Sequence, residues 1–158
     1  MSVPAILFVC LGNICRSPLA EAAFRARAAD AGIVVTADSA GTGGWHVGDP
    51  PDPRAQATAF RHGIDISRYR GRQIESADFR RFTQIFALDH TNLADLARVA
   101  PADATAEVGL LLDLVQGSEG ESVADPYYGA DAQFEEAWEQ VDAAALALVS
   151  RLIREQAG

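Results

Sequence analysis

The segment from Cys10 to Pro18 carries the residue types best suited to chemistry, because a thiol, a guanidinium and a hydroxyl stand close together at Cys10, Arg16 and Ser17. It follows the apolar run 5–9, which predicts a buried strand. Pro18 suits the first turn of a helix. The segment is therefore predicted to form a loop between the carboxyl end of a strand and the start of a helix. Loops in this position bind phosphate groups.

The composition of this loop predicts a nucleophile beneath a bound anion. Gly12 and Asn13 tolerate the left-handed backbone that a tight loop needs. Backbone N–H groups in such a loop converge on one anion, the helix adds the positive end of its dipole, and the guanidinium of Arg16 binds two phosphoryl oxygens. The same charges favour a thiolate at Cys10. The alternative interpretation, a small buried apolar cysteine, is weaker beside Asn13, Arg16 and Ser17.

Two segments together resemble the low-molecular-weight protein tyrosine phosphatase family. They are residues 9–18, Val-Cys-Leu-Gly-Asn-Ile-Cys-Arg-Ser-Pro, and residues 125–129, Asp-Pro-Tyr-Tyr-Gly. Further matching segments fall between them in the order and spacing of that family, at 38–42, 48–51, 61–64 and 88–89. The resemblance extends over essentially the whole chain, so a single phosphatase domain is expected over residues 1–158.

The hydrophobic pattern predicts an α/β fold in which strands and helices alternate. Strands are predicted at 5–9, 33–36, 83–88 and 106–112. Helices are predicted at 18–31, 53–61, 76–81 and 92–99, and a last amphipathic helix has an apolar stripe from Phe134 to Leu152. This alternation predicts a single-domain three-layer sandwich, with a central four-stranded parallel sheet flanked by helices. The phosphate-binding loop after the first strand lies at the carboxyl edge, where such sheets bind ligands.

The resemblance implies a catalytic role for four residues. Cys10 attacks phosphorus and forms a phosphocysteine, while Arg16 binds the phosphoryl oxygens. Asp125 donates a proton to the leaving oxygen and later activates water as a base, and an acid so positioned contributes ~10²–10⁴-fold in rate. Ser17 donates a hydrogen bond to the Cys10 thiolate and is also expected to cap the helix. The phosphate-binding loop itself consists of Leu11, Gly12, Asn13, Ile14 and Cys15.

Residues outside the loop are assigned to the cleft, to loop support or to redox protection. By the same resemblance, Asn13 and Ser39 brace the loop. The walls of the substrate cleft are expected to be aromatic side chains and one histidine, namely Trp45, His46, Tyr127 and Tyr128. Cys15 lies in the same curled loop as Cys10, so a disulfide between them is predicted to protect an oxidised Cys10. The alternative for Cys15 is a small loop residue that points into the core.

Composition and charge exclude several other classes of protein. The chain has 158 residues, and its formal net charge of −9 argues against binding nucleic acid or an anionic membrane. The apolar run 5–9 is too short for a signal sequence or a membrane span, so a cytoplasmic location is expected. The only cysteines are Cys10 and Cys15, and the histidines His46, His62 and His90 show no ligand spacing, so no metal and no cofactor are predicted.

The expected activity is hydrolysis of protein phosphotyrosine, and of small aryl phosphates, without a cofactor. The expected partners are a phosphotyrosine-containing protein, for which a tyrosine kinase is one candidate, and inorganic phosphate or a similar oxyanion as inhibitor. Three alternatives remain open. Arginine phosphatases of this family carry Thr in place of Ile14, and the related arsenate reductases use further thiols downstream, of which this chain has none. A noncatalytic phosphotyrosine-binding module would need neither Cys10 nor Asp125.

Overall fold

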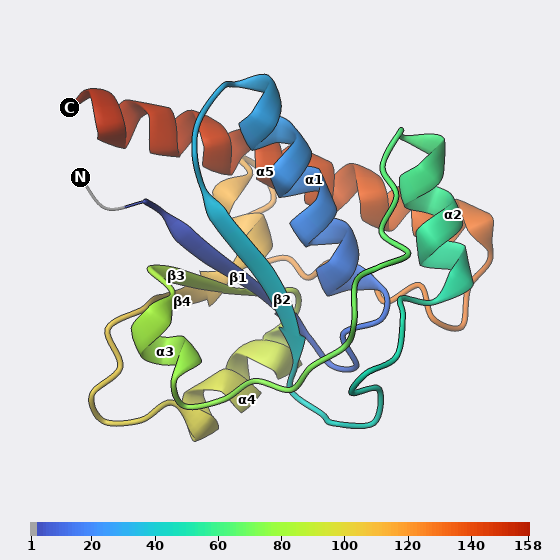
Figure 1. Ribbon diagram of the computed structural model, residues 1–158, viewed down its shortest axis with the longest axis horizontal. Helices are drawn as coiled ribbons and strands as arrows, with labels where there is room; N and C mark the ends of the chain where they lie inside the picture. The colour runs from blue at the N-terminus through green and yellow to red at the C-terminus, as the bar shows by residue number, and fades with distance from the viewer. Residues whose placement is uncertain (1–2) are drawn as a thin grey trace.

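A four-stranded parallel sheet forms the centre of the computed structural model, which describes residues 3–158 (Figure 1). Its strands are β1 (Ala5–Cys10), β2 (Thr36–Gly41), β3 (Gln84–Ala87) and β4 (Glu107–Leu110), in the order β2-β1-β3-β4. The helices are α1 (Arg16–Asp30), α2 (Pro53–Arg61), α3 (Asp78–Arg81), α4 (His90–Val99) and α5 (Asp131–Ala157). A 3-10 turn, Leu111–Leu114, follows β4.

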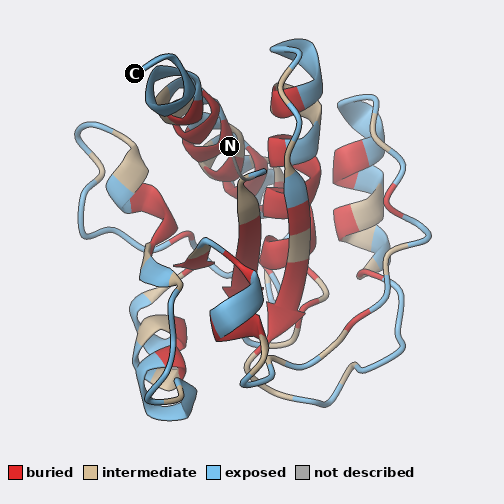
Figure 2. Cartoon of the chain, turned by 60° about the vertical axis from the view of Figure 1, so that its left-hand side comes forward, coloured by how far each residue is buried: buried red, intermediate tan, exposed pale blue. Residues whose placement is uncertain are grey.

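The two faces of the sheet pack against different helices, which produces the three predicted layers (Figure 2). In β1, Ile6 and Phe8 belong to a core shared with α1, α2 and α5, whereas Leu7 and Val9 belong to a core shared with α3 and α4. Successive side chains of a strand point to opposite faces, so a strand between two helical layers is apolar throughout. The continuous apolar run 5–9 is explained in this way.

Helix ends follow the local sequence, with one exception at the phosphate-binding loop. The side chain of Asp52 accepts a hydrogen bond from the N–H of Arg54 and caps α2, as predicted, with Pro53 in the first position. Helix α1 begins at Arg16, and no side chain caps it. Ser17 therefore lies within the first turn, and its predicted capping role is wrong. Its hydroxyl is directed instead to Cys10, as described below.

Two strands differ from the sequence prediction. The second strand begins at Thr36, whose N–H bonds the carbonyl of Pro4, and it extends to Gly41 instead of covering 33–36. Val34, with 73% of its surface exposed, lies in the connection. The fourth strand ends at Leu110, because the chain turns into the 3-10 segment there. The remaining predicted elements are present, with ends that differ by a few residues.

The chain order creates a crevice at the carboxyl ends of β1 and β3. From β1 the chain crosses through α1 to β2 on one side, and β3 and β4 then occupy the other side. Neighbouring strands whose connections leave in opposite directions separate at their carboxyl ends, and ligands bind in that crevice. Cys10 ends β1, and Asp89 follows shortly after β3. Among residues 3–158, no helix is long and apolar enough to cross a membrane.

Candidate active site

The phosphate-binding loop, residues 11–15, connects β1 to α1. Asn13 has a left-handed backbone with φ of 59°, as predicted. Gly12 does not have a positive φ, so that part of the prediction is wrong. A Cβ atom at position 12 would stand 3.2 Å from Cδ2 of His46, so glycine there leaves room for this side chain. Within residues 3–158, the backbone N–H groups of residues 11–15 donate no hydrogen bond to protein, which leaves them available to an anion.

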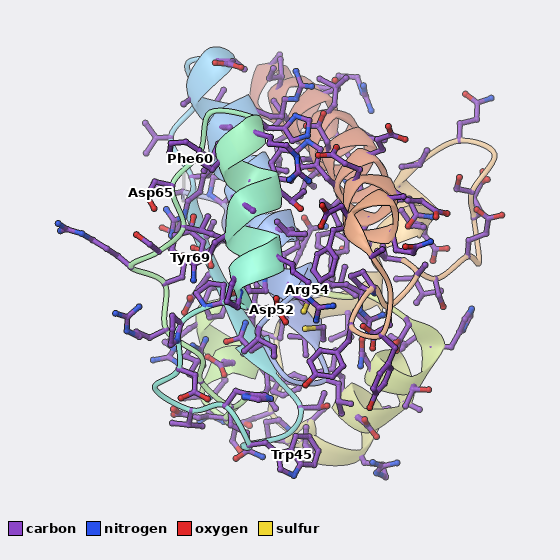
Figure 3. All side chains as sticks on the ribbon, turned by 90° about the vertical axis from the view of Figure 1, so that its right-hand side faces the viewer. Trp45, Asp52, Arg54, Phe60, Asp65 and Tyr69 are labelled. Carbon is purple, nitrogen blue, oxygen red and sulfur yellow. The ribbon has the colours of Figure 1, made fainter. Side chains whose placement is uncertain are left out.

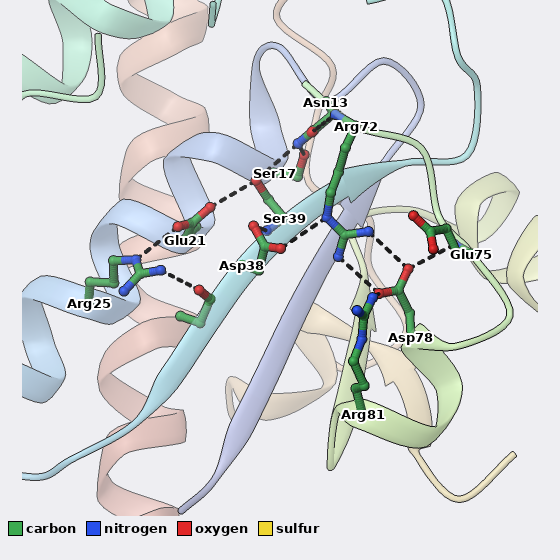
Figure 4. Close-up of polar contacts among 11 residues, drawn as sticks. Asn13, Ser17, Glu21, Arg25, Asp38, Ser39, Arg72, Glu75, Asp78 and Arg81 are labelled. Carbon is green, nitrogen blue, oxygen red and sulfur yellow. Dashed lines mark hydrogen bonds and ion pairs between the residues drawn. The ribbon is translucent and has the colours of Figure 1, made fainter. Parts of the chain in front are cut away.

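A chain of buried hydrogen bonds leads from Glu21 through Ser39 and Asn13 to Ser17 (Figure 4), and from there to the sulfur of Cys10. Nδ2 of Asn13 lies 2.8 Å from Oγ of Ser17 and 3.0 Å from Oγ of Ser39. Oγ of Ser17 lies 3.0 Å from Sγ of Cys10. Ser39 in turn donates to a carboxylate oxygen of Glu21 at 2.9 Å. The structure therefore joins Asn13 and Ser39, the residues predicted to brace the loop, with Ser17, the residue predicted to donate to Cys10, behind the nucleophile position.

The guanidinium of Arg16 is buried and fixed along one edge. Its Nη1 donates to Oδ2 of Asp89 at 2.8 Å and to the carbonyl oxygen of Val123 at 2.9 Å. In the described part of the chain, Nε and Nη2 donate no hydrogen bond to protein, and Nη2 lies 3.7 Å from Oδ2 of Asp125. The free edge of the guanidinium is the one that can bind two oxygens of a phosphoryl group.

A cleft of about 240 Å³ opens above this loop. All four predicted cleft residues, Trp45, His46, Tyr127 and Tyr128, line it. The other lining residues are Cys10, Leu11, Gly12, Ile14, Cys15, Arg16 and Asp125. Asp125 is half exposed, and its Oδ1 accepts the N–H of Tyr127 at 3.1 Å. Ser17, Asn13 and Ser39 do not line the cleft and lie behind the loop. A thiol, a guanidinium and a carboxyl group thus meet in one open cleft.

Asp52 and Arg54 connect the phosphate-binding loop to the segment that carries Asp125, residues 123–130, which we call the acid loop. The N–H of Asp52 donates to the carbonyl oxygen of Ile14 at 2.9 Å. Arg54 pairs with the Asp52 carboxylate, and its Nη1 donates to the carbonyl oxygen of Gly129 at 3.1 Å. Hydrogen bonds from Arg54 hold the pKa of Asp52 below its ordinary value. Both side chains reach from the start of α2 towards the cleft (Figure 3).

The sequence reasoning assigned no role to Asp89, Arg54 or Glu21. Asp89 offers the one usable signal, because it follows the strand beside β1 and parallel strands end at the same edge of a sheet. Arg54 and Glu21 lie in helices and resemble ordinary surface residues in the sequence. Both cysteines are free and buried. Burial, followed by the charge of Asp52, raises the pKa of Cys15 well above its ordinary value. Residues 3–158 contain no cluster of side chains able to hold a metal.

Comparison with known proteins places this geometry in a defined group. The family model described as low molecular weight phosphotyrosine protein phosphatase matches residues 5–157. A low molecular weight protein-tyrosine-phosphatase of Streptomyces coelicolor is 46% identical over 156 residues, covering 96% of this chain and 94% of the relative. The crystal structure of YfkJ from Bacillus subtilis superimposes with a TM-score of 0.90 at 40% identity and covers 98% of each chain.

A Drosophila arginine phosphatase also shares the fold. Its crystal structure has a TM-score of 0.86 at 32% identity and covers 94% of this chain and 97% of its own. The sandwich and the loop are therefore common to phosphatases that act on different phosphorylated residues. The side chains of the cleft, rather than the fold, must distinguish the substrates.

Proposed function

The chain belongs to the low molecular weight phosphotyrosine protein phosphatase family, and we propose that it hydrolyses protein phosphotyrosine through a cysteinyl-phosphate intermediate. The observation that carries this proposal is the meeting of Cys10, Arg16 and Asp125 in one cleft. The backbone N–H groups of the phosphate-binding loop donate no hydrogen bond within residues 3–158 and are available to a phosphoryl group bound there. Cys10 and Arg16 flank one loop, whereas Asp125 comes from the distant acid loop, and their meeting has no evident structural purpose.

The geometry supports a reaction in two steps. In the first, the loop donors and the free edge of Arg16 bind the phosphoryl oxygens, and Sγ of Cys10 attacks phosphorus. The bond from phosphorus to the tyrosyl oxygen breaks, and Asp125 gives its proton to that oxygen. In the second step, the Asp125 carboxylate takes a proton from water as the water attacks the phosphocysteine. Inorganic phosphate leaves, and the Cys10 thiolate and protonated Asp125 are restored.

The side chains around the cleft favour a phosphorylated aromatic ring over phosphoarginine. Trp45 and Tyr127 stand at its mouth, and Ile14 contributes an apolar surface to its wall. A flat aryl ring gains more than a guanidinium from such walls. The fold is shared with an arginine phosphatase, so protein arginine phosphatase activity remains the second candidate. Arsenate reduction is disfavoured because Cys10 and Cys15 are the only thiols.

The proposal is tested by comparing kcat/KM for peptides that carry phosphotyrosine, phosphoserine or phosphoarginine. We expect phosphotyrosine to be preferred, and a preference for phosphoarginine would contradict the proposed substrate.

Cys10→Ser should fold and bind vanadate, yet lose turnover. Asp125→Asn should slow phenyl phosphate far more than p-nitrophenyl phosphate, because only the poorer leaving group needs the proton. Equal slowing of both substrates would show that another group is the acid.

Further expectations stay predictions. A single domain over residues 1–158, a cytoplasmic location, a tyrosine kinase as the substrate protein and oxyanion inhibitors rest on the sequence reasoning alone. The disulfide between Cys10 and Cys15 belongs with them. Phosphoproteins as the general substrate class follow from family membership.

A further inference from the structure

A second hollow, of about 220 Å³, lies beside the cleft and shares a wall with it. Leu11 and Trp45 line both spaces. The other residues of the second hollow come from the end of β2, the segment before α3 and the last turns of α4, and they are Thr42, Gly43, Ile74, Asp95, Arg98 and Val99. None of these six residues lines the cleft or has a role in the proposed reaction. We call this space the side hollow.

The side hollow is apolar and open to solvent. Trp45 is 71% exposed and Val99 is 49% exposed, and Leu11 is also exposed. Ile74 supplies a partly buried apolar surface from the segment before α3. Exposed apolar side chains that surround one concavity indicate a surface that another molecule covers. The hollow, of about 220 Å³, has room for an apolar side chain.

The shared wall is fixed in position despite its exposure. A Cβ atom at Gly43 would stand only 1.7 Å from Cζ3 of Trp45, so the indole ring lies directly on the Gly43 backbone. The segment that carries Gly43 is held by two hydrogen bonds, from the N–H of Thr42 to the carbonyl of Cys10 and from the N–H of Gly43 to the carbonyl of Leu11. The wall therefore exists before any ligand binds, which reduces the ordering cost of binding.

The two charged groups of the side hollow cancel each other. Asp95 and Arg98 pair with each other at the rim and bring no net charge. The hollow thus combines an apolar surface with a neutral rim.

We infer that the side hollow binds an apolar side chain of the substrate protein, close in sequence to the phosphotyrosine. This inference rests on the proposed function, because the cleft must hold the phosphotyrosine itself. Leu11 and Trp45 form the wall between the cleft and the side hollow. An extended peptide advances about 3.3 Å per residue. A residue within a few positions of the phosphotyrosine can therefore cross this wall and place its side chain in the side hollow. Val99 at the end of α4 becomes a specificity-determining residue.

The first measurement is kcat/KM for phosphotyrosine peptides on a background of Gly and Ser. A single Leu, Asp or Lys is placed in turn at each of the three positions before and after the phosphotyrosine. We expect Leu to raise kcat/KM about tenfold at one or two positions, equivalent to ~1.4 kcal/mol, with Asp and Lys giving no gain. Equal values for all three residues at every position would overturn the inference.

The second measurement compares Val99→Asp with Phe60→Asp. Phe60 is 73% exposed on α2 and lies at the opposite end of the molecule from Trp45 (Figure 3). Both variants exchange an exposed apolar side chain for a carboxylate, so they are matched in charge. Val99→Asp should abolish the preference for Leu and leave p-nitrophenyl phosphate hydrolysis unchanged, because that substrate does not extend beyond the cleft. Phe60→Asp should alter neither.

The outcomes separate the inference from the proposed function. If p-nitrophenyl phosphate is hydrolysed and Val99→Asp keeps the preference for Leu, the side hollow is not the site and the inference fails alone. If the wild-type protein hydrolyses no aryl phosphate, the proposed function fails and the inference fails with it. A preference for Leu that is lost in Val99→Asp and kept in Phe60→Asp supports the inference.

Discussion

The Ser17 hydroxyl has a single proton, and the surrounding hydrogen bonds decide where it points. The backbone N–H of Arg72 lies 3.0 Å from Oδ1 of Asn13 and can only donate, which fixes that oxygen as an acceptor. Nδ2 of Asn13 must then donate to Oγ of Ser17. The Ser17 proton remains free for Sγ of Cys10. A donor directed at sulfur stabilises the negative charge that the nucleophile needs.

Asp89 uses its two oxygens for two tasks, and this allows a sharp test of its role. Oδ2 accepts from Arg16, whereas Oδ1 accepts the N–H of Asn92 at 2.7 Å and caps α4. Asparagine has one oxygen, so Asp89→Asn keeps the cap and loses the partner of Arg16. We expect kcat for p-nitrophenyl phosphate to fall by roughly 10- to 100-fold, as the guanidinium moves from its productive position.

The comparison with Asp89→Ala separates positioning from stability. Alanine removes the cap as well, so we expect this variant to lose about 1 kcal/mol more free energy of unfolding than Asp89→Asn, measured by urea denaturation. Its kcat should match that of Asp89→Asn. An Asp89→Asn protein with the wild-type kcat would show that the main-chain oxygen of Val123 alone positions Arg16.

The predicted redox protection depends on Cys15 and can be measured directly. Peroxide oxidises the Cys10 thiolate to a sulfenic acid and is reduced to water. Sγ of Cys15 would then displace water from that sulfur to form the disulfide, which dithiothreitol reduces to two thiols. The raised pKa of Cys15 leaves little thiolate near neutral pH, so we expect protection to be slow at pH 6 and faster at pH 8.5. After peroxide treatment, Cys15→Ser should recover less activity than the wild type, and equal recovery would contradict the role of Cys15.

Site residues were found in the sequence where their neighbours carry the chemistry, or where the family resemblance assigned them, as for Asp125. The residues that were missed, Asp89, Arg54 and Glu21, had neither signal. Cys10, Arg16 and Ser17 belong to one loop, so their types and spacing carry the chemistry together. Asp89 stands 73 positions from Arg16, and nothing near it in the sequence names its partner. The sequence also does not show where a side chain points. Ser17 at the start of a helix predicts a helix cap, whereas in the structure its hydroxyl lies against Sγ of Cys10.

At the scale of elements, the errors lie where small or polar residues form a strand. The segment from Thr36 to Gly41, Thr-Ala-Asp-Ser-Ala-Gly, has little β-propensity, yet it pairs with β1 along its whole length. The apolar residues 33–35 just before it have a higher β-propensity, so the strand is predicted there instead. Tertiary pairing overrides propensity here, because β1 needs a partner on its open edge. Strands β1 and β3, in which Gln84 is the one polar residue, are predicted well.

The start of α2 is the element that sets the distance between the phosphate-binding loop and the acid loop. Arg54 contacts the acid loop through Gly129 and through the ring of Tyr127, whose centre lies 5.6 Å from the guanidinium. Arg54→Met removes both interactions together with the ion pair to Asp52, and it keeps the apolar stem. We expect kcat for phenyl phosphate to fall by roughly 3- to 10-fold, with p-nitrophenyl phosphate almost unchanged, because only the acid is displaced.

Arg61→Met is the matched control for this variant. Arg61 ends α2 and pairs with Glu135 on the surface, away from the acid loop. We expect this variant to hydrolyse phenyl phosphate and p-nitrophenyl phosphate each at the wild-type rate. An Arg54→Met protein that slows both substrates alike would show that Arg54 supports the phosphate-binding loop and not the position of Asp125.

At the scale of the whole molecule, buried ion pairs join the layers behind the site. Asp78 is fully buried and accepts hydrogen bonds from Arg72 at 3.0 Å and from Arg81 at 2.6 Å (Figure 4). Arg72 also binds Asp38 at 2.9 Å, so α3 is tied to β2. Because the N–H of Arg72 holds Asn13, this network reaches the phosphate-binding loop. The charge state of Asp78 therefore affects both the free energy of unfolding and the position of the phosphate-binding loop.

The contributions of Asp78 and Glu21 to the free energy of unfolding change with pH in opposite directions. Burial alone would raise the pKa of Asp78, but hydrogen bonds from Arg72, Glu75 and Arg81 outweigh it and hold the pKa below its ordinary value. A lowered pKa gives stability that is present above the unfolded value, about 3.9, and is lost as the pH falls through the folded value. Burial raises the pKa of Glu21, so its contribution falls as the pH rises from about 4.3.

Asp78→Asn should therefore destabilise the protein in a manner that depends on pH. We expect a loss of roughly 1–3 kcal/mol in the free energy of unfolding at pH 7, because the buried side chain at position 78 loses its charge-assisted hydrogen bonds from Arg72 and Arg81, while Arg72 keeps its pair with Asp38. The loss should shrink as the pH falls below about 3.9, because the unfolded wild-type chain then binds a proton at Asp78 that the folded protein, with its lowered pKa, does not yet bind. Urea denaturation between pH 3 and pH 8 measures both effects. Asp103→Asn, which breaks the exposed pair with Arg80, is the control and should cost less than about 1 kcal/mol at every pH. If Asp78→Asn costs as much at pH 3 as at pH 7, the charge of Asp78 does not hold this network, and its packing alone must account for the loss.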